Sequence, residues 1–454
     1  MSSFMDHGIE KKESDQPENS ISPLDDPQPH ATEKQKQGSF FSPLRVRNFQ
    51  LLFAGQTIST LGDTFYAVAL PWLVLTTGGN PQELGIILTG YGLPRMGTIL
   101  LGGVLSDKIR PRRVMLIADA VRALLVAILA ALGIMGHPTF WQLLAVAIPL
   151  GAFEGLFIPA SFSMIPDTLD DADLQAGNSL NFSSSQLATL VGSGIAGVVV
   201  SAVSSGIALV VDAGTFIVSA VSLMSMHSKN VATLVTANAA PTMGQVETTN
   251  TRSSESTSAP TLSFWRIIRS SALVQVAFVI AVVANLAIGG IVEVALPALA
   301  HGPLNAGAQG FGFLLSSFGA GALIGSIVTG LLSKLTHRGI ISLIVAIVQA
   351  IAIALIPYAG GLIGALICML IMGCTNSITN VLFITLIQQT VPRAQLGRLM
   401  SVIMFASLGS YPLSVLLAGI LVMHTGPAIM FPISATFLTV GALFGLSRRE
   451  VRQL

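Results

Sequence analysis

The sequence has 454 residues, of which 52% are hydrophobic and only 10% are Asp, Glu, Lys or Arg, whereas soluble domains contain about 25% charged residues. This composition excludes a soluble globular protein, because the charged side chains are too few to cover the surface of one such domain. The net charge of +1, with no basic cluster interleaved with aromatic residues, argues against a nucleic-acid partner. The continuous apolar runs favour membrane-spanning helices over the alternating strands of a barrel.

Residues 1–42 predict a disordered cytoplasmic tail, since a chain so rich in Asp, Ser, Gln and Lys buries too little apolar area to fold. Twelve long apolar runs follow in two groups of six, each bounded by Gly, Pro, Asn or charge. The first group, within 43–227, covers about 49–76, 84–106, 114–135, 139–163, 178–202 and 206–227. The second group, within 265–447, covers about 270–299, 308–334, 339–357, 361–387, 399–422 and 427–446.

The polar residues between and after these groups predict a cytoplasmic linker at 228–264 and a short cytoplasmic tail at 448–454. All of the 23 Lys and Arg residues except Arg95 and Arg122 fall in the tails, the linker or the alternate connections on the same side. Because positive charge is retained in the cytoplasm, both termini of this multi-pass plasma-membrane protein are expected there. The predicted fold is an all-α integral membrane protein of twelve transmembrane helices in two six-helix halves, a layout that suits a transporter.

The connection between the second and third runs carries a motif, Gly103-Val-Leu-Ser-Asp107-Lys108-Ile-Arg110-Pro-Arg112-Arg113. Together with the twelve spans, it resembles the loop signature of the major facilitator superfamily. The resemblance implies that Asp107 latches onto the start of the eleventh helix, near Gly397 and Arg398, in the outward-facing state. A carboxylate near a helix N-terminus is favourable on general grounds. The simpler interpretation is that the basic residues only hold the loop in the cytoplasm.

Further motifs resemble the branch that holds the macrolide-efflux and enterobactin-export proteins: Arg47-Asn-Phe49, Leu61-Gly62-Asp63, Asp119-Ala-Val-Arg122, Asp212-Ala-Gly-Thr215-Phe216 and Gly397-Arg398-Leu-Met-Ser401. Two positions depart from the exporters of the superfamily. Gly192-Ser193 stands where many have Gly-Pro, and Glu154 lies where drug–proton antiporters often carry Arg. The resemblance implies export, and the departures leave an importer or facilitator open.

Ionisable side chains inside the spans are costly, so they are expected to be paired or functional. The candidates for proton coupling or the substrate cavity are Asp63, Arg95, Glu154, Asp212 and Glu293. Asp63 and Glu154 are interpreted either as carboxyls that bind and release a proton or as hydrogen-bonded structural acids, and Arg95 is expected to pair with one of them.

Asp119 and Arg122 are three residues apart on one helical face and predict a neutralised pair beside the cytoplasmic gate. Aromatic and amide residues predict the rest of an apolar cavity with a few polar groups: Phe65, Tyr66, Trp72, Asn285, Asn376 and Asn380. The Gly321-x-x-x-Gly325 spacing predicts a close helix contact.

These features predict a monomeric secondary transporter in the lipid bilayer that exports amphipathic or hydrophobic small molecules, as in drug or secondary-metabolite efflux, in exchange for protons. No nucleotide-binding loop exists to use ATP. No catalytic centre, metal or cofactor is expected, because the seven His fall in tails or loops and the two Cys are six residues apart. An importer or facilitator of a small metabolite, or a non-transporting membrane sensor, remains the alternative.

Overall fold

The computed structural model describes residues 41–170, 172–227, 272–331, 338–390 and 393–448. Across these residues the chain is almost entirely helical, and they contain no strand. The predicted terminal tails and the linker lie outside this description, apart from Phe41, Ser42 and Arg448, so their bounds stay predictions.

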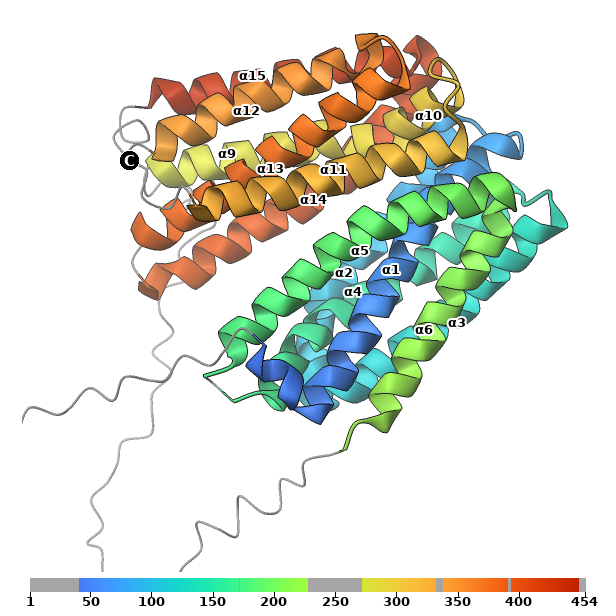
Figure 1. Cartoon of the computed structure of the whole chain (residues 1–454), viewed down its shortest axis with the longest axis vertical. Coiled ribbons are helices and arrows are strands. Elements are labelled where there is room, and N and C mark those ends of the chain that lie inside the picture. Colours follow the sequence, from blue (N-terminus) through green and yellow to red (C-terminus); the bar gives the residue numbers. More distant parts are fainter. Residues whose placement is uncertain (1–40, 171, 228–271, 332–337, 391–392, 449–454) are drawn as a thin grey trace, which may run out of the picture. The chain divides into compact units, whose positions relative to one another are not determined.

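The first group of helices forms the N-terminal bundle, coloured blue to green in Figure 1. A short 3-10 helix, η1 (Ser42–Arg45), precedes it. The six long helices are α1 (Arg47–Thr76), α2 (Pro81–Lys108), α3 (Pro111–Met135), α4 (Phe140–Thr168), α5 (Leu174–Ala202) and α6 (Ser205–Ser225). Within the bundle, α2 packs on α4, and α1 and α3 both pack on α6.

The second group forms the C-terminal bundle, coloured yellow to red in Figure 1. Its first span is built from three consecutive pieces, α9 (Ala272–Gly290), the π-helical turn η2 (Ile291–Ala295) and α10 (Leu296–His301). The other five spans, with their short 3-10 helices, are α11 (Gly307–Leu331), α12 (Arg338–Leu355) with η3 (Ile356–Tyr358), α13 (Leu362–Thr390), α14 (Arg393–Thr425) and, after η4 (Pro427–Ile429), α15 (Met430–Ser447).

The twelve predicted spans are confirmed as helices. Eleven of them are long and apolar enough to cross a membrane by length and composition, and α2, with 28 residues, is the twelfth. Several helices extend beyond the apolar runs: α14 begins at Arg393 rather than 399, and α4 continues to Thr168 rather than 163. An apolar run marks the hydrocarbon-facing part of a helix, whereas its polar end turns remain helical. For the same reason His301 and His424, expected in loops, lie in the last turns of α10 and α14.

Capping residues begin three helices of the N-terminal bundle, α2, α4 and α6. The side chain of Asn80 accepts a hydrogen bond from the Glu83 N–H, and Ser204 accepts one from the N–H of Ile207. Thr139 forms a capping box with Gln142 at the start of α4. Each of these contacts satisfies a backbone donor that the first helical turn leaves without an intrahelical partner.

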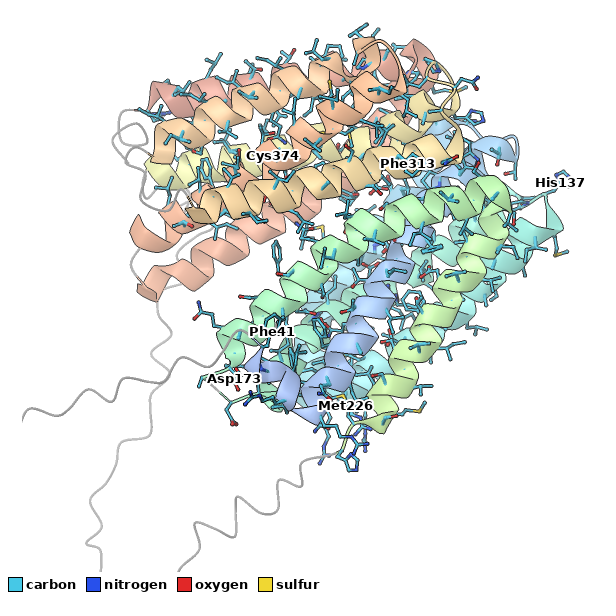
Figure 2. All side chains as sticks on the ribbon, in the orientation of Figure 1. Phe41, His137, Asp173, Met226, Phe313 and Cys374 are labelled. Carbon is cyan, nitrogen blue, oxygen red and sulfur yellow. The ribbon has the colours of Figure 1, made fainter. Side chains whose placement is uncertain are left out.

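The outward faces of the helices carry large apolar side chains, drawn as sticks in Figure 2. Leu124 is 61% exposed, Ile363 77% and Phe437 55%. In water such a surface would be unfavourable, whereas in a bilayer it contacts acyl chains of matching polarity. The exposed apolar surface therefore agrees with the membrane assignment made from composition.

The two ends of the spans differ in charge. At the end where α1 begins and α2 stops, here called the basic end, lie several basic side chains: Arg45, Arg47, Lys108, Arg110, Arg112 and Arg113. The described connections at the opposite end, here called the far end, contain no Lys or Arg; they are 77–80, 136–139, 203–204, 302–306, 359–361 and 426. The expectation that the basic end faces the cytoplasm stays a prediction.

Glycines allow the two bundles to approach closely in the far-end halves of their helices. A Cβ added to Gly85 of α2 would lie 3.0 Å from Gly419 Cα of α14, and one added to Gly197 of α5 would lie 2.9 Å from Gly312 Cα of α11. These backbones therefore nearly touch, an approach that a larger residue prevents. The α2–α14 and α5–α11 pairs form the principal contacts between the bundles.

The predicted contact at Gly321 and Gly325 is confirmed, and α13 is the partner of these glycines. An added Cβ would lie 2.0 Å from the Leu370 carbonyl oxygen at Gly321 and 2.2 Å from the Cys374 carbonyl oxygen at Gly325. Real Cβ atoms do not approach an oxygen so closely, so α11 and α13 pack through these two glycines.

We expect Gly321→Val to lower the free energy of unfolding by ~1–3 kcal/mol, because overpacking forces α11 away from the α13 backbone. The measurement is the thermal unfolding midpoint of the detergent-purified protein. Gly330→Val is the matched control in the same helix, since an added Cβ there meets no atom within 4 Å. Equal midpoints for the two variants would show that the contact contributes no stability.

Candidate transport cavity

A cavity of about 160 Å³ lies between helices of both bundles, near the middle of α1, α2 and α4. Helix α1 contributes Asp63 and Tyr66, and the opposite wall comes from Glu293 of η2 and Tyr411 of α14. Apolar side chains fill the gaps between the polar ones: Ala67, Leu70, Pro71 and Leu88. We call this the acidic cavity, because three of its lining residues are carboxylic acids.

Arg95 pairs with Glu154 across the wall of the acidic cavity, with 3.2 Å between Nη2 and Oε1. The Arg95 side chain is 33% exposed and that of Glu154 16%. Of the two partners left open for Arg95, Glu154 is therefore the one it meets. The pair joins α2 to α4, and both side chains remain accessible from the cavity.

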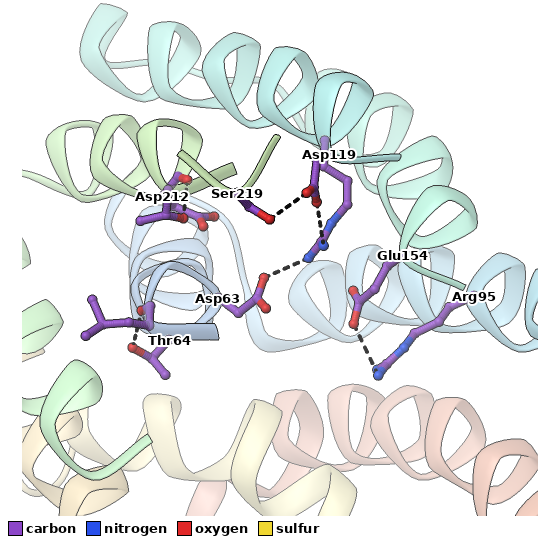
Figure 3. A network of polar contacts seen from close by, with 10 residues as sticks. Asp63, Thr64, Arg95, Asp119, Glu154, Asp212 and Ser219 are labelled. Carbon is purple, nitrogen blue, oxygen red and sulfur yellow. Dashed lines mark hydrogen bonds and ion pairs between the residues drawn. The ribbon is translucent and has the colours of Figure 1, made fainter. Parts of the chain in front are cut away.

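Asp63, Arg122 and Asp119 form a second network inside the N-terminal bundle, drawn in Figure 3. Arg122 Nη2 donates a hydrogen bond of 2.7 Å to Asp63 Oδ1, and Arg122 Nη1 lies 3.9 Å from Asp119 Oδ1. Ser219 Oγ of α6 donates a 2.7 Å hydrogen bond to Asp119 Oδ2, and the Phe216 ring lies 4.1 Å from the guanidinium carbon. The predicted Asp119–Arg122 pair is present, but Asp63 is the closer partner of Arg122.

Asp212 lies in the interior of α6, beyond the first turn, where Ser204 provides the cap. Asp212 is 1% exposed, and its carboxyl group lies beside the side chain of Thr215, one turn further along α6. A Cβ added to Gly62 of α1 would lie 2.6 Å from Asp212 Oδ1. Asp212 is thus packed against the α1 backbone one residue before Asp63, and does not line the acidic cavity.

Glu293 connects the C-terminal bundle to the acidic cavity. The Tyr411 hydroxyl donates a hydrogen bond to Glu293 Oε1. On the opposite wall, the Tyr66 ring lies 6.0 Å from that of Tyr91, and the Tyr66 hydroxyl has no partner among the described residues. The cavity therefore presents carboxyl groups, one guanidinium and three phenol rings to any molecule inside it.

A second cavity of about 240 Å³ lies on the basic-end side of the acidic cavity. Asn285, Met96 and Ser407 line it, together with Arg95 and Tyr411, which also line the acidic cavity. We call it the inner cavity. Because they line both cavities, Arg95 and Tyr411 are the side chains that separate them.

The other predicted cavity residues lie apart from the acidic cavity. Phe65 is buried in the core, and the Trp72 ring contacts the ring of His301 near the far end. Asn380 Nδ2 donates to the Asn376 carbonyl oxygen and side-chain oxygen on α13. Among the described residues lining the two cavities, neither of these asparagines occurs.

The loop-signature residues lie at the basic end, as their position in the sequence requires. Lys108 ends α2, and Arg110 and Arg113 are exposed next to it. Arg112 Nη2 donates a 2.8 Å hydrogen bond to the Met224 carbonyl oxygen, so this base ties the start of α3 to the end of α6. The side chains of the predicted latch, at Asp107 and Arg398, lie outside the described set, as do Gly103 and Gly397, so the latch stays a prediction.

The sequence-based reasoning omitted Tyr91, Tyr411 and Ser219 from the site. A signal for Tyr411 was present, since the sequence holds only four tyrosines and a phenol in the middle of a span needs a hydrogen-bond partner. Ser219 offered no such signal, because serine in a membrane helix commonly bonds to its own backbone.

Comparison with known proteins identifies the relatives of this chain. The family model described as Major Facilitator Superfamily matches residues 52–414. The multidrug efflux pump Tap of Mycolicibacterium fortuitum is 32% identical over 174 residues, a match that spans 37% of this chain and 42% of the pump. The enterobactin exporter EntS of Salmonella typhimurium is 23% identical over 354 residues, which are 77% of this chain and 80% of the exporter.

A solved structure shows the same fold. The nucleoside transporter NupG superposes with a TM-score of 0.68 and 13% identity, over 88% of this chain and 98% of that transporter. The matched family and these relatives are transporters rather than enzymes, in agreement with the expectation from the sequence.

We expect Arg122→Leu to lower the free energy of unfolding by ~3–5 kcal/mol, because it leaves Asp119 buried without a cationic partner. Adding Asp119→Leu should restore most of that stability, since apolar residues can replace a buried ion pair at little cost. A double-mutant cycle on thermal unfolding midpoints measures the coupling. Additive losses would show that Arg122 and Asp119 do not stabilise each other.

Proposed function

The chain belongs to the major facilitator superfamily of membrane transporters, and from this we propose that it works as a monomer that exports amphipathic or hydrophobic small molecules in exchange for protons, by alternating access. The observation that carries this proposal is the acidic cavity, to which both bundles contribute carboxyl groups and aromatic rings.

The relatives support export as the direction. Tap is named as a multidrug efflux pump and EntS as an enterobactin exporter. The match to EntS extends over most of both chains. We propose the same outward direction for this chain, across the plasma membrane, with the basic end and both termini in the cytoplasm.

The charge of the spans supports coupling to protons. Inside the described spans, five carboxyl groups (Asp63, Asp119, Glu154, Asp212 and Glu293) are accompanied by only two guanidinium groups (Arg95 and Arg122). An uncompensated excess of negative charge is unfavourable in a nonpolar interior. Protons are the simplest compensation, and a cationic cargo that enters the acidic cavity would displace them. Competition for the same carboxyls is the physical basis of an exchange.

The lining of the acidic cavity supports an amphipathic cargo. Leu70 and Leu88 provide apolar surface, and the phenol rings of Tyr66 and Tyr91 lie beside it. Aromatic rings contact both apolar groups and cations favourably. The charged groups Glu154 and Arg95 would fix the polar part of the cargo.

The contacts between the bundles support alternating access. The tight glycine contacts lie in the far-end halves of α2, α5, α11 and α14, whereas the inner cavity lies on the basic-end side of the acidic cavity. A molecule from the basic end would therefore meet the inner cavity first and find the far end closed. Release at the far end would require these glycine contacts to separate and the basic end to close, where we place the Asp107 latch.

Dye efflux tests the proposed function. In bacteria lacking their own drug pumps, we expect expression to lower steady-state accumulation of ethidium or Nile red several-fold, and a protonophore to abolish the effect. Asp63→Asn and Glu154→Gln should lose efflux, because an amide does not exchange a proton. Glu83→Gln, at the far-end start of α2, is the matched control and should keep it. Efflux that survives the protonophore would exclude proton coupling, and increased uptake would favour the importer.

A separate measurement tests the latch. We expect Asp107→Ala to slow dye efflux several-fold while the purified variant binds the same dye with nearly unchanged affinity, because the latch acts on the conformational change and not on the cavity. A large loss of binding would instead place Asp107 in the binding site.

A further inference from the structure

The first span of the C-terminal bundle is interrupted at the acidic cavity by the π-helical turn η2. The Leu296 N–H donates to the Ile291 carbonyl oxygen, closing the wider turn, and Glu293 lies in its middle. Single π-helical turns inside α-helices are rare and occur frequently at functional sites. Glu293 is therefore set apart from the other intramembrane acids by the backbone that carries it.

Helix α14 holds this turn through two side chains three residues apart, and therefore on one helical face. Ser414 Oγ accepts a 2.8 Å hydrogen bond from the Gly290 N–H and donates one to the Leu286 carbonyl oxygen, just before the turn. Tyr411 donates to Glu293 inside the turn. The Ser414 contacts involve no titratable group, whereas the Tyr411 contact ends on a carboxyl group.

Tyr411 is also part of the partition between the two cavities, since Tyr411 and Arg95 line both. Each of these side chains is held by an acid. Glu154 holds Arg95 at 3.2 Å, and Glu293 accepts the hydrogen bond of Tyr411. A molecule moving from the inner cavity to the acidic cavity therefore passes these two side chains.

We propose that Glu293 is a second proton-binding site of the transporter, in the C-terminal bundle, and that its hydrogen bond to Tyr411 keeps the partition between the cavities closed. A hydrogen bond to a carboxylate is roughly twice as strong as one between neutral groups. Proton binding to Glu293 therefore weakens its hold on Tyr411, and the ring is free to swing aside. The inference rests on the proposed proton coupling and assigns a part of it to the C-terminal bundle.

Six other charged or titratable groups line the acidic cavity around Glu293. From α14 it faces Tyr411, from α2 Arg95 and Tyr91, from α1 Asp63 and Tyr66, and from α4 Glu154. The described residues of α9, α10 and α15 place no Asp, Glu, Lys or Arg in the cavity lining. Glu154 bonds to the partition through Arg95, and Glu293 bonds to it through Tyr411, so mutation of Glu293 or Tyr411 removes the second contact and leaves the first.

Thiol labelling tests the gate without any cargo. In a Cys368→Ala, Cys374→Ala background, Ala67→Cys reports on the acidic cavity and Ser407→Cys on the inner cavity. Both are labelled with a water-soluble maleimide in detergent, and the ratio of their rates cancels the pH dependence that the two thiols share. When the pH is lowered from about 8 to about 5, we expect the labelling rate at Ala67→Cys, divided by the rate at Ser407→Cys, to rise about tenfold. This factor corresponds to about 1.4 kcal/mol.

Two variants assign this rise to the proposed contact. Glu293→Gln and Tyr411→Phe should each give the high ratio at every pH, because neither retains a charged acceptor paired with a hydroxyl donor. Glu83→Gln and Tyr358→Phe are matched controls at the far end and should behave as the parent, since Tyr358 is 66% exposed in η3. The unchanged rate at Ser407→Cys reports that each variant is folded.

An unaltered pH response in Glu293→Gln or in Tyr411→Phe would overturn the proposal. So would a parallel rise at Gln82→Cys, which lies where α2 meets Gly419 of α14, because that would mean that the far end opens instead. Labelling is independent of dye efflux. A chain that fails to export dye but shows the Glu293-dependent response would therefore refute the proposed export and leave the gate standing.

Discussion

The guanidinium of Arg122 joins three helices of the N-terminal bundle, because it lies between Asp63 of α1, Asp119 of α3 and the ring of Phe216 of α6. A charge in a nonpolar interior is tolerated only when opposite charge and hydrogen bonds surround it. The three helices are therefore held in one arrangement. Asp63 takes part in that arrangement with one oxygen, while its 45% exposed side chain lines the acidic cavity. The cavity acid is thus positioned by a structural cation.

The C-terminal bundle meets this framework through a different kind of contact. Glu293 and Tyr411 form a hydrogen bond at the cavity, and Arg95 of the N-terminal bundle is held by Glu154 beside them. The bundles themselves touch through glycine backbones in their far-end halves. Backbone contacts of this kind have no charge to desolvate, so they can separate and re-form at modest cost. Paired charges fix the interior of the N-terminal bundle, and small residues allow the two bundles to move.

The sequence predicted the positions of the spans and of the buried charges well. It predicted less well which charged side chains pair with each other. A long apolar run identifies a membrane helix from local composition. A charged residue inside the run is easily recognised as a functional or paired residue, because placing it in the bilayer costs free energy. Pairing depends on which helices are neighbours. Arg122 was expected to pair with Asp119, three residues away, yet Asp63, 59 residues away, lies closer. The π-helical form of the turn at Glu293 also gave no signal, since apart from Glu293 its residues are as apolar as those around it.

Composition and charge distribution by themselves determined that this chain is a bundle of twelve membrane helices in two groups. The reason is that the preference of a segment for lipid or for water depends on its own residues and not on their tertiary contacts. The family likeness followed from short motifs at the ends of the spans and inside them. Only the tertiary structure decided that Arg95 belongs to Glu154, that Asp212 is packed against Gly62, and that Arg95 and Tyr411 divide two cavities. These contacts join helices far apart in the chain, and their geometry depends on packing that no local pattern encodes.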